Sequence, residues 1–162
     1  MIAWFISLKI ILKKTLLENI GSDRTKGFLF QFGYEIGVSA ESAKELQKDH
    51  SSQRGSKSMH AMYGHVRDVI IDPNFDKLLD RSTERITGQW IDSFEAILHK
   101  KHLNLSDNCE CFTSCGYVSG FLSARYHHPL VAVETKCVAK GDSCCEFEVR
   151  LEENWDPQAI EN

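Results

Sequence analysis

The chain has 162 residues, of which 42% are hydrophobic and 26% are charged. This length suits one domain, and the composition excludes disordered, collagen-like and low-complexity proteins. The net charge of -4 excludes the broad basic surface of a direct nucleic-acid binder. The apolar start at residues 1–6 lacks a signal-peptide cleavage site, and lysines interrupt it too early for a membrane span. We therefore expect a cytoplasmic protein that does not enter the membrane.

The N-terminal third is predicted to be helical. Apolar side chains recur every four residues over 7–20, which predicts an amphipathic helix that ends at Gly21. A second helix is predicted over 23–36, with Phe28 and Phe32 on one face. Such an aromatic face is typical of a helix that contributes to the core or to a pocket.

The middle of the chain is predicted to mix loop, strand and helix. Residues 50–58 are polar and aperiodic, which indicates a loop or a lid. β-Branched residues predict strands over 60–71 and 84–90. A capping-box pattern at 92–95 then predicts a helix that extends to about His102.

The C-terminal part is predicted to be a helix followed by a hairpin. Over 111–126, small residues recur every four positions and allow close packing against another element. Strands are predicted over 130–136 and 144–151, where apolar and charged residues alternate so that one face is buried. The residues alone therefore predict a mixed α and β domain.

All six cysteines lie in the last third of the chain, a clustering typical of a metal site rather than of a disulfide scaffold. Two thiolates across a hairpin, a third before a helix and one carboxylate could make a closed zinc site with no position for a catalytic water. The candidate ligands are Cys111, Glu134, Cys137 and Cys145. Spacing alone leaves Cys109 and Cys144 as alternatives to their neighbours, because adjacent strand residues point to opposite faces. The other interpretation is that these thiols are small buried hydrophobic groups.

The remaining motifs favour no catalytic chemistry. His99 and His102 lie one helical turn apart, but Lys100 and Lys101 beside them are typical of a solvated surface. The sequence has no Gly-rich phosphate loop and no nucleophile with a matching base and orienting residue. We therefore expect that the chain is not an enzyme.

Several spaced segments resemble a known family. Those in the C-terminal half strongly resemble the 4-vinyl reductase domain, and those upstream are similar to the N-terminal sensor domain of XylR-type activators of aromatic catabolism. Together the resemblance covers roughly residues 8–151. The segments that carry it are 16–21, 32–37, 59–64, 90–96, 111–121, 133–142 and 145–149.

The resemblance implies an α+β fold similar to the nitric-oxide-signalling and Golgi-transport ligand-binding domains, with helices packed around an antiparallel sheet and a buried pocket. It also implies that structural zinc is bound by Cys111, Glu134, Cys137 and Cys145, which leaves Cys109, Cys115 and Cys144 as non-ligands. The expected organisation is an extension at 1–7, a sensor-like region at 8–151 and a tail at 152–162. Within the sensor-like region we expect a helical part at 8–49, a loop at 50–58 and a zinc-binding part at 59–151.

The resemblance further implies a pocket for a small aromatic effector, between the sheet and the helix over 23–36. In the phenol sensors a histidine and a tryptophan hold the ligand hydroxyl through ring N–H groups, and the matching positions are His60 and Trp90. Phe121 falls where a pocket aromatic occurs, whereas Ala132 stands where phenol sensors carry a larger aromatic, which would enlarge the pocket. By residue type alone, a lone histidine or tryptophan is equally typical of ordinary packing.

The predicted function is a zinc-containing sensor of a small aromatic molecule that regulates transcription and forms a homodimer. In the family this domain precedes a sigma-54-type activator ATPase and a helix-turn-helix. Neither follows here, which indicates a separated or stand-alone sensor that acts through a partner. The alternatives are a tetrapyrrole carrier or 4-vinyl reductase, although the chain has no nicotinamide or flavin motif, and an assembly module without a ligand.

Overall fold

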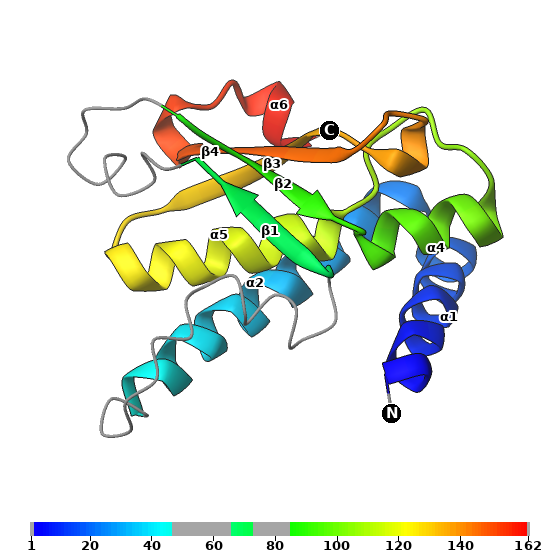
Figure 1. Cartoon of the computed structure of the whole chain (residues 1–162), viewed down its shortest axis with the longest axis horizontal. Coiled ribbons are helices and arrows are strands. Elements are labelled where there is room, and N and C mark those ends of the chain that lie inside the picture. Colours follow the sequence, from blue (N-terminus) through cyan, green and yellow to red (C-terminus); the bar gives the residue numbers. More distant parts are fainter. Residues whose placement is uncertain (1, 47–65, 73–84, 162) are drawn as a thin grey trace.

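In the computed structural model, residues 2–46, 66–72 and 85–161 are described (Figure 1). The strands among them form a four-stranded antiparallel sheet in the order β1-β2-β4-β3. The elements, in chain order, are α1 (Ile2–Ile20), α2 (Ser22–Leu46), β1 (Asp68–Ile71), β2 (Ile86–Ile91), α4 (Phe94–Leu103), α5 (Phe112–Tyr126), β3 (Leu130–Lys136), η2 (Val138–Lys140), β4 (Cys145–Leu151), η3 (Glu152–Asn154) and α6 (Pro157–Glu161). The predicted α+β class is confirmed.

The elements largely follow the predicted periodicities. The first helix ends at Ile20, and Gly21 has a φ of 79°, the left-handed conformation that favours glycine after a helix. This helix begins at Ile2, so the segment expected as an extension at 1–7 is mostly helical. The predicted loop at 50–58 and His60 lie outside the described residues. None of the helices in the described part is long and apolar enough to cross a membrane.

Helix α5 lies at the centre of the domain, against β3 on one side and α2 on the other (Figure 1). Every residue from Thr113 to Leu122 is buried. The expected pocket between the sheet and α2 is therefore wrong, because α5 occupies that position. Phe28 and Phe32 are 46% and 43% exposed, so the aromatic stripe of α2 is not its contact face with α5.

The contact between α2 and α5 is made by glycines on both helices. Gly33 and Gly37 of α2 face the backbone of α5, and Gly116 and Gly120 of α5 face the backbone of α2. At Gly120, a Cβ atom would lie 2.8 Å from the carbonyl carbon of Tyr34. Backbone atoms cannot rotate away as a side chain can, so these helices approach closely only because the glycines lack a Cβ.

We expect Gly120→Ala to lower the free energy of unfolding by about 1–3 kcal/mol, because the added methyl group overpacks this helix contact. Gly27→Ala is the matched control, since Gly27 lies on α2, the partner helix of this contact, and a Cβ atom there would have no atom within 4 Å in the described structure. Alanine is the better helix former, so the control should gain up to about 1 kcal/mol. Urea denaturation measures both, and equal effects of the two substitutions would contradict the close contact.

Candidate metal centre and ligand pocket

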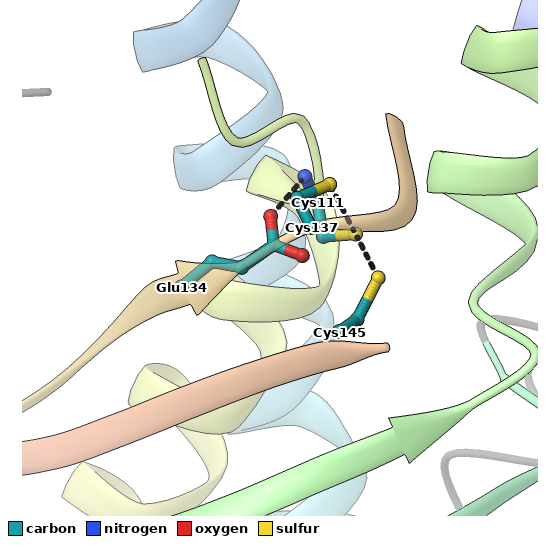
Figure 2. A group of neighbouring side chains, drawn as sticks. All are labelled: Cys111, Glu134, Cys137 and Cys145. Atoms are coloured by element: carbon teal, nitrogen blue, oxygen red, sulfur yellow. Dashed lines mark hydrogen bonds between the residues drawn. The ribbon is translucent and has the colours of Figure 1, made fainter. Parts of the chain in front are cut away.

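The four predicted metal ligands come together. One ligand atom from each of Cys111, Glu134, Cys137 and Cys145 lies within 4.8 Å of all the others, and all four residues are buried (Figure 2). Cys111 precedes α5, Glu134 lies on β3, Cys137 follows that strand, and Cys145 begins β4. The structure thus joins the start of the central helix to both strands of the hairpin at one point.

The turn between the two strands places Cys137 and Cys145 side by side. The carbonyl of Cys137 accepts hydrogen bonds from the N–H groups of Lys140 and Asp142, at 3.0 and 3.1 Å. The Asp142 carboxylate accepts the N–H of Cys137 at 2.8 Å, and the N–H of Val138 points to the Cys145 sulfur at 3.3 Å. This closed turn holds two sulfurs and supplies one of them with a backbone donor, as is typical of metal-binding thiolates.

The cluster fits a cation. Glu134 Oε2 accepts the N–H groups of Glu110 and Cys111, at 3.1 and 2.9 Å, whereas Oε1 is buried with no hydrogen-bond partner in the described part of the chain. A buried carboxylate oxygen without a partner is costly, and a metal ion would satisfy it.

The sulfur spacing leads to the same conclusion. Cys111 Sγ lies 4.0 Å from the Cys137 sulfur and 3.9 Å from the Cys145 sulfur, too far for disulfides. Zinc–sulfur bonds of about 2.3 Å in a tetrahedron place sulfurs about 3.8 Å apart. Three thiolates and one carboxylate therefore suit a closed zinc site.

Without a cation the cluster holds protons. Burial raises the pKa of Glu134 to about 9, and the neighbouring Cys137 adds to the rise. Burial also raises the pKa of the Cys111 thiol, whereas hydrogen bonds from Cys111 and Cys145 lower the pKa of Cys137 to about 2. For Cys145, the hydrogen bond with Cys111 lowers the pKa, but the bond with Cys137 and burial outweigh it, and the net shift is upward. One thiolate is thus shared among three sulfurs.

We expect Zn²⁺ binding at pH 7 to release about three protons, from Cys111, Cys145 and Glu134, because ligands must be deprotonated to bind zinc. The apparent affinity should therefore rise with pH through 9 and beyond, and bound zinc should raise the melting temperature. Calorimetric titration in buffers of different ionisation enthalpy counts the protons. A count near zero would show that the cluster is already ionised and would contradict the pKa shifts.

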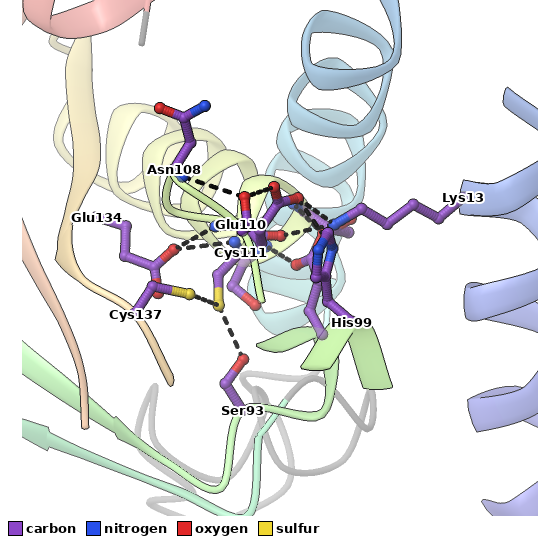
Figure 3. A network of polar contacts seen from close by, with 12 residues as sticks. Lys13, Ser93, His99, Asn108, Glu110, Cys111, Glu134 and Cys137 are labelled. Carbon is purple, nitrogen blue, oxygen red and sulfur yellow. Dashed lines mark hydrogen bonds and ion pairs between the residues drawn. The ribbon is translucent and has the colours of Figure 1, made fainter. Parts of the chain in front are cut away.

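A buried polar network adjoins the cluster (Figure 3). Lys13 of α1 is 4% exposed, and its ammonium lies 2.7 Å from Glu110 Oε2. His99 Nδ1 lies 3.2 Å from the same oxygen, and the Ser106 hydroxyl donates to Glu110 Oε1 at 2.6 Å. The expectation that His99 lies on a solvated surface is therefore wrong, because the flanking lysines occupy the outer face of α4 while His99 faces inward. His102 is exposed, as expected.

Glu110 carries its charge in the folded protein. Burial raises its pKa, but the contacts with His99 and Lys13 outweigh burial, and the pKa falls to about 2. A pKa below the ordinary value of 4.5 means that ionised Glu110 stabilises the fold above about pH 4.5. That contribution is lost as the pH falls from 4.5 towards 2.

We expect Lys13→Met to lower the free energy of unfolding at pH 7 by about 3–5 kcal/mol, because it leaves a buried carboxylate without its cation. Arg67→Met is the control: it removes the ion pair with Asp92, whose side chains are 66% and 53% exposed, and should cost about 1 kcal/mol or less. Denaturant titration measures both. Protonation of Glu110 at low pH should reduce the difference between them, and a constant difference from pH 7 to pH 3 would contradict the assignment.

The capping box predicted at 92–95 is not formed. Ser93 is the N-cap residue of α4, but its side chain makes no capping hydrogen bond. The Glu95 carboxylate instead accepts the N–H groups of Thr113 and Ser114, at 3.1 and 3.3 Å, and the Thr113 hydroxyl at 3.0 Å. Glu95 therefore caps α5, the helix that begins directly after Cys111.

The predicted pocket residues are buried aromatics. Trp90 is 2% exposed, stacks on Phe147 with ring centroids 4.5 Å apart, and has an indole N–H without a hydrogen-bond partner in the described part. Phe121 is buried and stacks on Tyr117. Phe147 lies opposite Gly88, and its ring fills the space that a side chain at Gly88 would need.

The roles of several residues around the metal cluster and Trp90 could not be predicted from the sequence. Each of these residues contacts a partner far along the chain, and no local motif predicts such contacts. They are Lys13, Ser93, Glu95, Glu110 and Phe147.

The fold and the buried cluster define an α+β domain with a candidate metal centre at the start of its central helix. Residues 6–76 match a family model described as an activator of aromatic catabolism. The chain is 28% identical over 147 residues to the transcriptional regulatory protein XylR of Pseudomonas putida, covering 88% of this chain and 26% of XylR. It is 27% identical over 160 residues to the phenol regulator MopR of Acinetobacter guillouiae, covering 96% of this chain and 28% of MopR.

The chain thus spans about a quarter of the length of these two regulators. The resemblance to the XylR-type sensor domain is confirmed. The relatives are named as regulators, which agrees with the expectation that the chain is not an enzyme.

Solved structures share the fold. The phenol-responsive sensory domain of the transcription activator PoxR, with phenol, superposes with a TM-score of 0.77 at 24% identity, covering 94% of this chain and 76% of that one. A vinyl-4-reductase family protein from Methanocaldococcus jannaschii gives 0.56 at 17% identity, covering 93% and 81%. A trafficking protein particle complex subunit 3 from Naegleria fowleri, covalently bound to palmitic acid, gives 0.53 at 15% identity, covering 91% and 95%. The predicted fold class is confirmed.

Proposed function

We propose that this chain is a zinc-containing sensor domain that binds a small, phenol-like aromatic effector and regulates transcription. The observation that carries the proposal is the Trp90 indole N–H, which is buried beside Phe147 and has no hydrogen-bond partner among the described residues. A donor in an apolar environment selects a ligand with a matching acceptor, and an aromatic hydroxyl offers one on an apolar body. The relatives named as phenol and transcriptional regulators support this choice.

Zinc in this proposal is structural, held by Cys111, Glu134, Cys137 and Cys145. A closed four-ligand ion supplies folding free energy and leaves no position for a substrate. Through these four residues, the ion would hold the start of α5 against the two strands of the hairpin, β3 and β4. A structural role requires nothing more of the ion.

The effector would be held by His60 and Trp90 as N–H donors, with Phe121 as an apolar contact. A change in the packing of the domain on binding would be passed to a sigma-54-type activator ATPase, and a homodimer is the expected assembly. The related regulators are about three and a half times as long as this chain, which supports an output that lies in other domains.

We expect phenol to raise the melting temperature of the zinc-loaded protein, since a ligand at a hundred times its Kd adds about 2.7 kcal/mol of stability. Trp90→Phe should abolish this shift, because phenylalanine keeps an aromatic ring but has no N–H. Trp155→Phe is the matched control, since the Trp155 indole N–H is already bonded to the Val131 carbonyl at 3.0 Å. A thermal-shift titration with phenol, cresols, catechol, toluene and a porphyrin measures the response.

The outcomes separate the candidate functions. Saturable stabilisation by a phenol that is lost in Trp90→Phe and retained in Trp155→Phe supports the sensor. Stabilisation by the porphyrin alone would identify a tetrapyrrole carrier instead. No response from any compound would contradict the sensor and leave an assembly module.

A further inference from the structure

The segment from Trp90 to Ser93 contacts two of the three sulfur ligands. Trp90 lies opposite Cys145 in the pairing of β2 with β4. Three residues later, the Ser93 hydroxyl oxygen lies 3.1 Å from the Cys111 sulfur, in the buried interior. Figure 3 shows Ser93 approaching the Cys111 sulfur from one side while Cys137 approaches it from the other. The segment that carries Trp90, the proposed contact with the effector, is therefore joined to the metal cluster at both of its ends.

The Ser93 hydroxyl does not make the hydrogen bond that a serine at this position normally makes. At a helix N-cap a serine usually accepts a backbone N–H of the first turn. Ser93 is the N-cap residue of α4 and is 2% exposed, yet it makes no such bond. The only hydrogen bond of the Ser93 side chain in the described part of the chain is the one with Cys111.

The direction of this hydrogen bond depends on the metal. A metal-bound Cys111 is a thiolate without a proton, so Ser93 must donate and the sulfur must accept. Hydrogen bonds to a charged acceptor are about twice as strong as those between neutral groups. Metal binding would therefore strengthen the Ser93 contact and hold the serine more tightly.

The segment between Trp90 and Ser93 has little freedom to absorb a movement of Ser93. It is paired in the sheet up to Ile91, and α4 starts at Phe94. Asp92 between them has a φ of 51°, a left-handed conformation uncommon outside glycine. Its carboxylate is also held by Arg67, 2.6 Å away. A shift at Ser93 is consequently passed to Trp90.

We infer that Ser93 is a positioning residue that couples the metal centre to Trp90, so that metal and aromatic effector each strengthen the binding of the other. The inference rests on the proposed function, since it takes Trp90 as the effector contact. Coupling of this kind is reciprocal: the factor by which metal strengthens effector binding equals the factor by which effector strengthens metal binding.

The test compares zinc-loaded full chains by calorimetric titration with phenol. Ser93→Ala should retain one zinc per chain but bind phenol at least about 5-fold more weakly, the lower end of typical coupling between sites. Ser93→Thr keeps the hydroxyl and should restore the wild-type Kd. Ser123→Ala is the matched control, because the Ser123 hydroxyl bonds both the N–H and the carbonyl of Leu130 and contacts no metal ligand.

The reciprocal measurement is competition for zinc by a chelator. Phenol should tighten zinc binding in the wild type and in Ser123→Ala, and should do so at least about 5-fold less in Ser93→Ala. An unchanged phenol Kd in zinc-loaded Ser93→Ala would overturn the inference, as would zinc binding in the wild type that does not depend on phenol.

A ligand-free measurement separates this inference from the proposed function. If the wild type binds no phenol, the proposed function as an aromatic sensor is wrong. The role of Ser93 can still be tested, by measuring how a change of metal affects Trp90. Exchange of Zn²⁺ for Cd²⁺ should move the Trp90 indole N–H signal in ¹H–¹⁵N NMR spectra of the wild type and of Ser93→Thr. The signal should move less in Ser93→Ala, where the exchange reaches Trp90 only through its pairing with Cys145. Equal movement in all three proteins would overturn the inference.

Discussion

Two neighbouring backbone N–H groups, those of Glu110 and Cys111, donate to one carboxylate oxygen of Glu134, and the rest of the site depends on this contact. It fixes the chain just before α5. With the backbone held there, the Cys111 side chain meets Cys137 and Cys145, while the Glu110 side chain reaches Lys13. The metal cluster and the buried polar network are thus neighbouring parts of one short segment.

Both parts place ionisable groups in the interior. The cluster collects a carboxylate and thiols that hold protons until a cation replaces them, and Glu110 is a buried carboxylate that Lys13 neutralises. Lys13 lies on α1, so the first helix of the chain is tied by a charge to the loop that carries a metal ligand. Helix α5, which starts in this loop, then packs on α2 through glycines. Helices α1, α2 and α5 are consequently positioned relative to the same point.

Most of the fold could be predicted from the sequence, because its signals are local. The alternation in β4, the small-residue repeat of α5 and the clustered cysteines depend only on near neighbours. The errors occur where a residue finds a distant partner. Glu95 follows a capping pattern but caps α5, and His99 lies beside lysines but faces Glu110. Phe32 shares a face with Phe28 but not with the glycines that make the helix contact. No local pattern encodes such pairings.

The sheet explains why the metal centre and the effector contact lie so close together. Alternate residues of each strand point to the same face, and the buried sets are Ile86, Gly88 and Trp90 on β2, Leu130, Ala132 and Glu134 on β3, and Cys145, Phe147 and Val149 on β4. The metal ligands Glu134 and Cys145 are end members of the sets that include Ala132 and Phe147. The cluster therefore continues the face that carries Trp90. An ion that draws β3 and β4 together at one end also sets how tightly Phe147 stacks on Trp90, so the geometry of the aromatic site depends on the closure of the metal site.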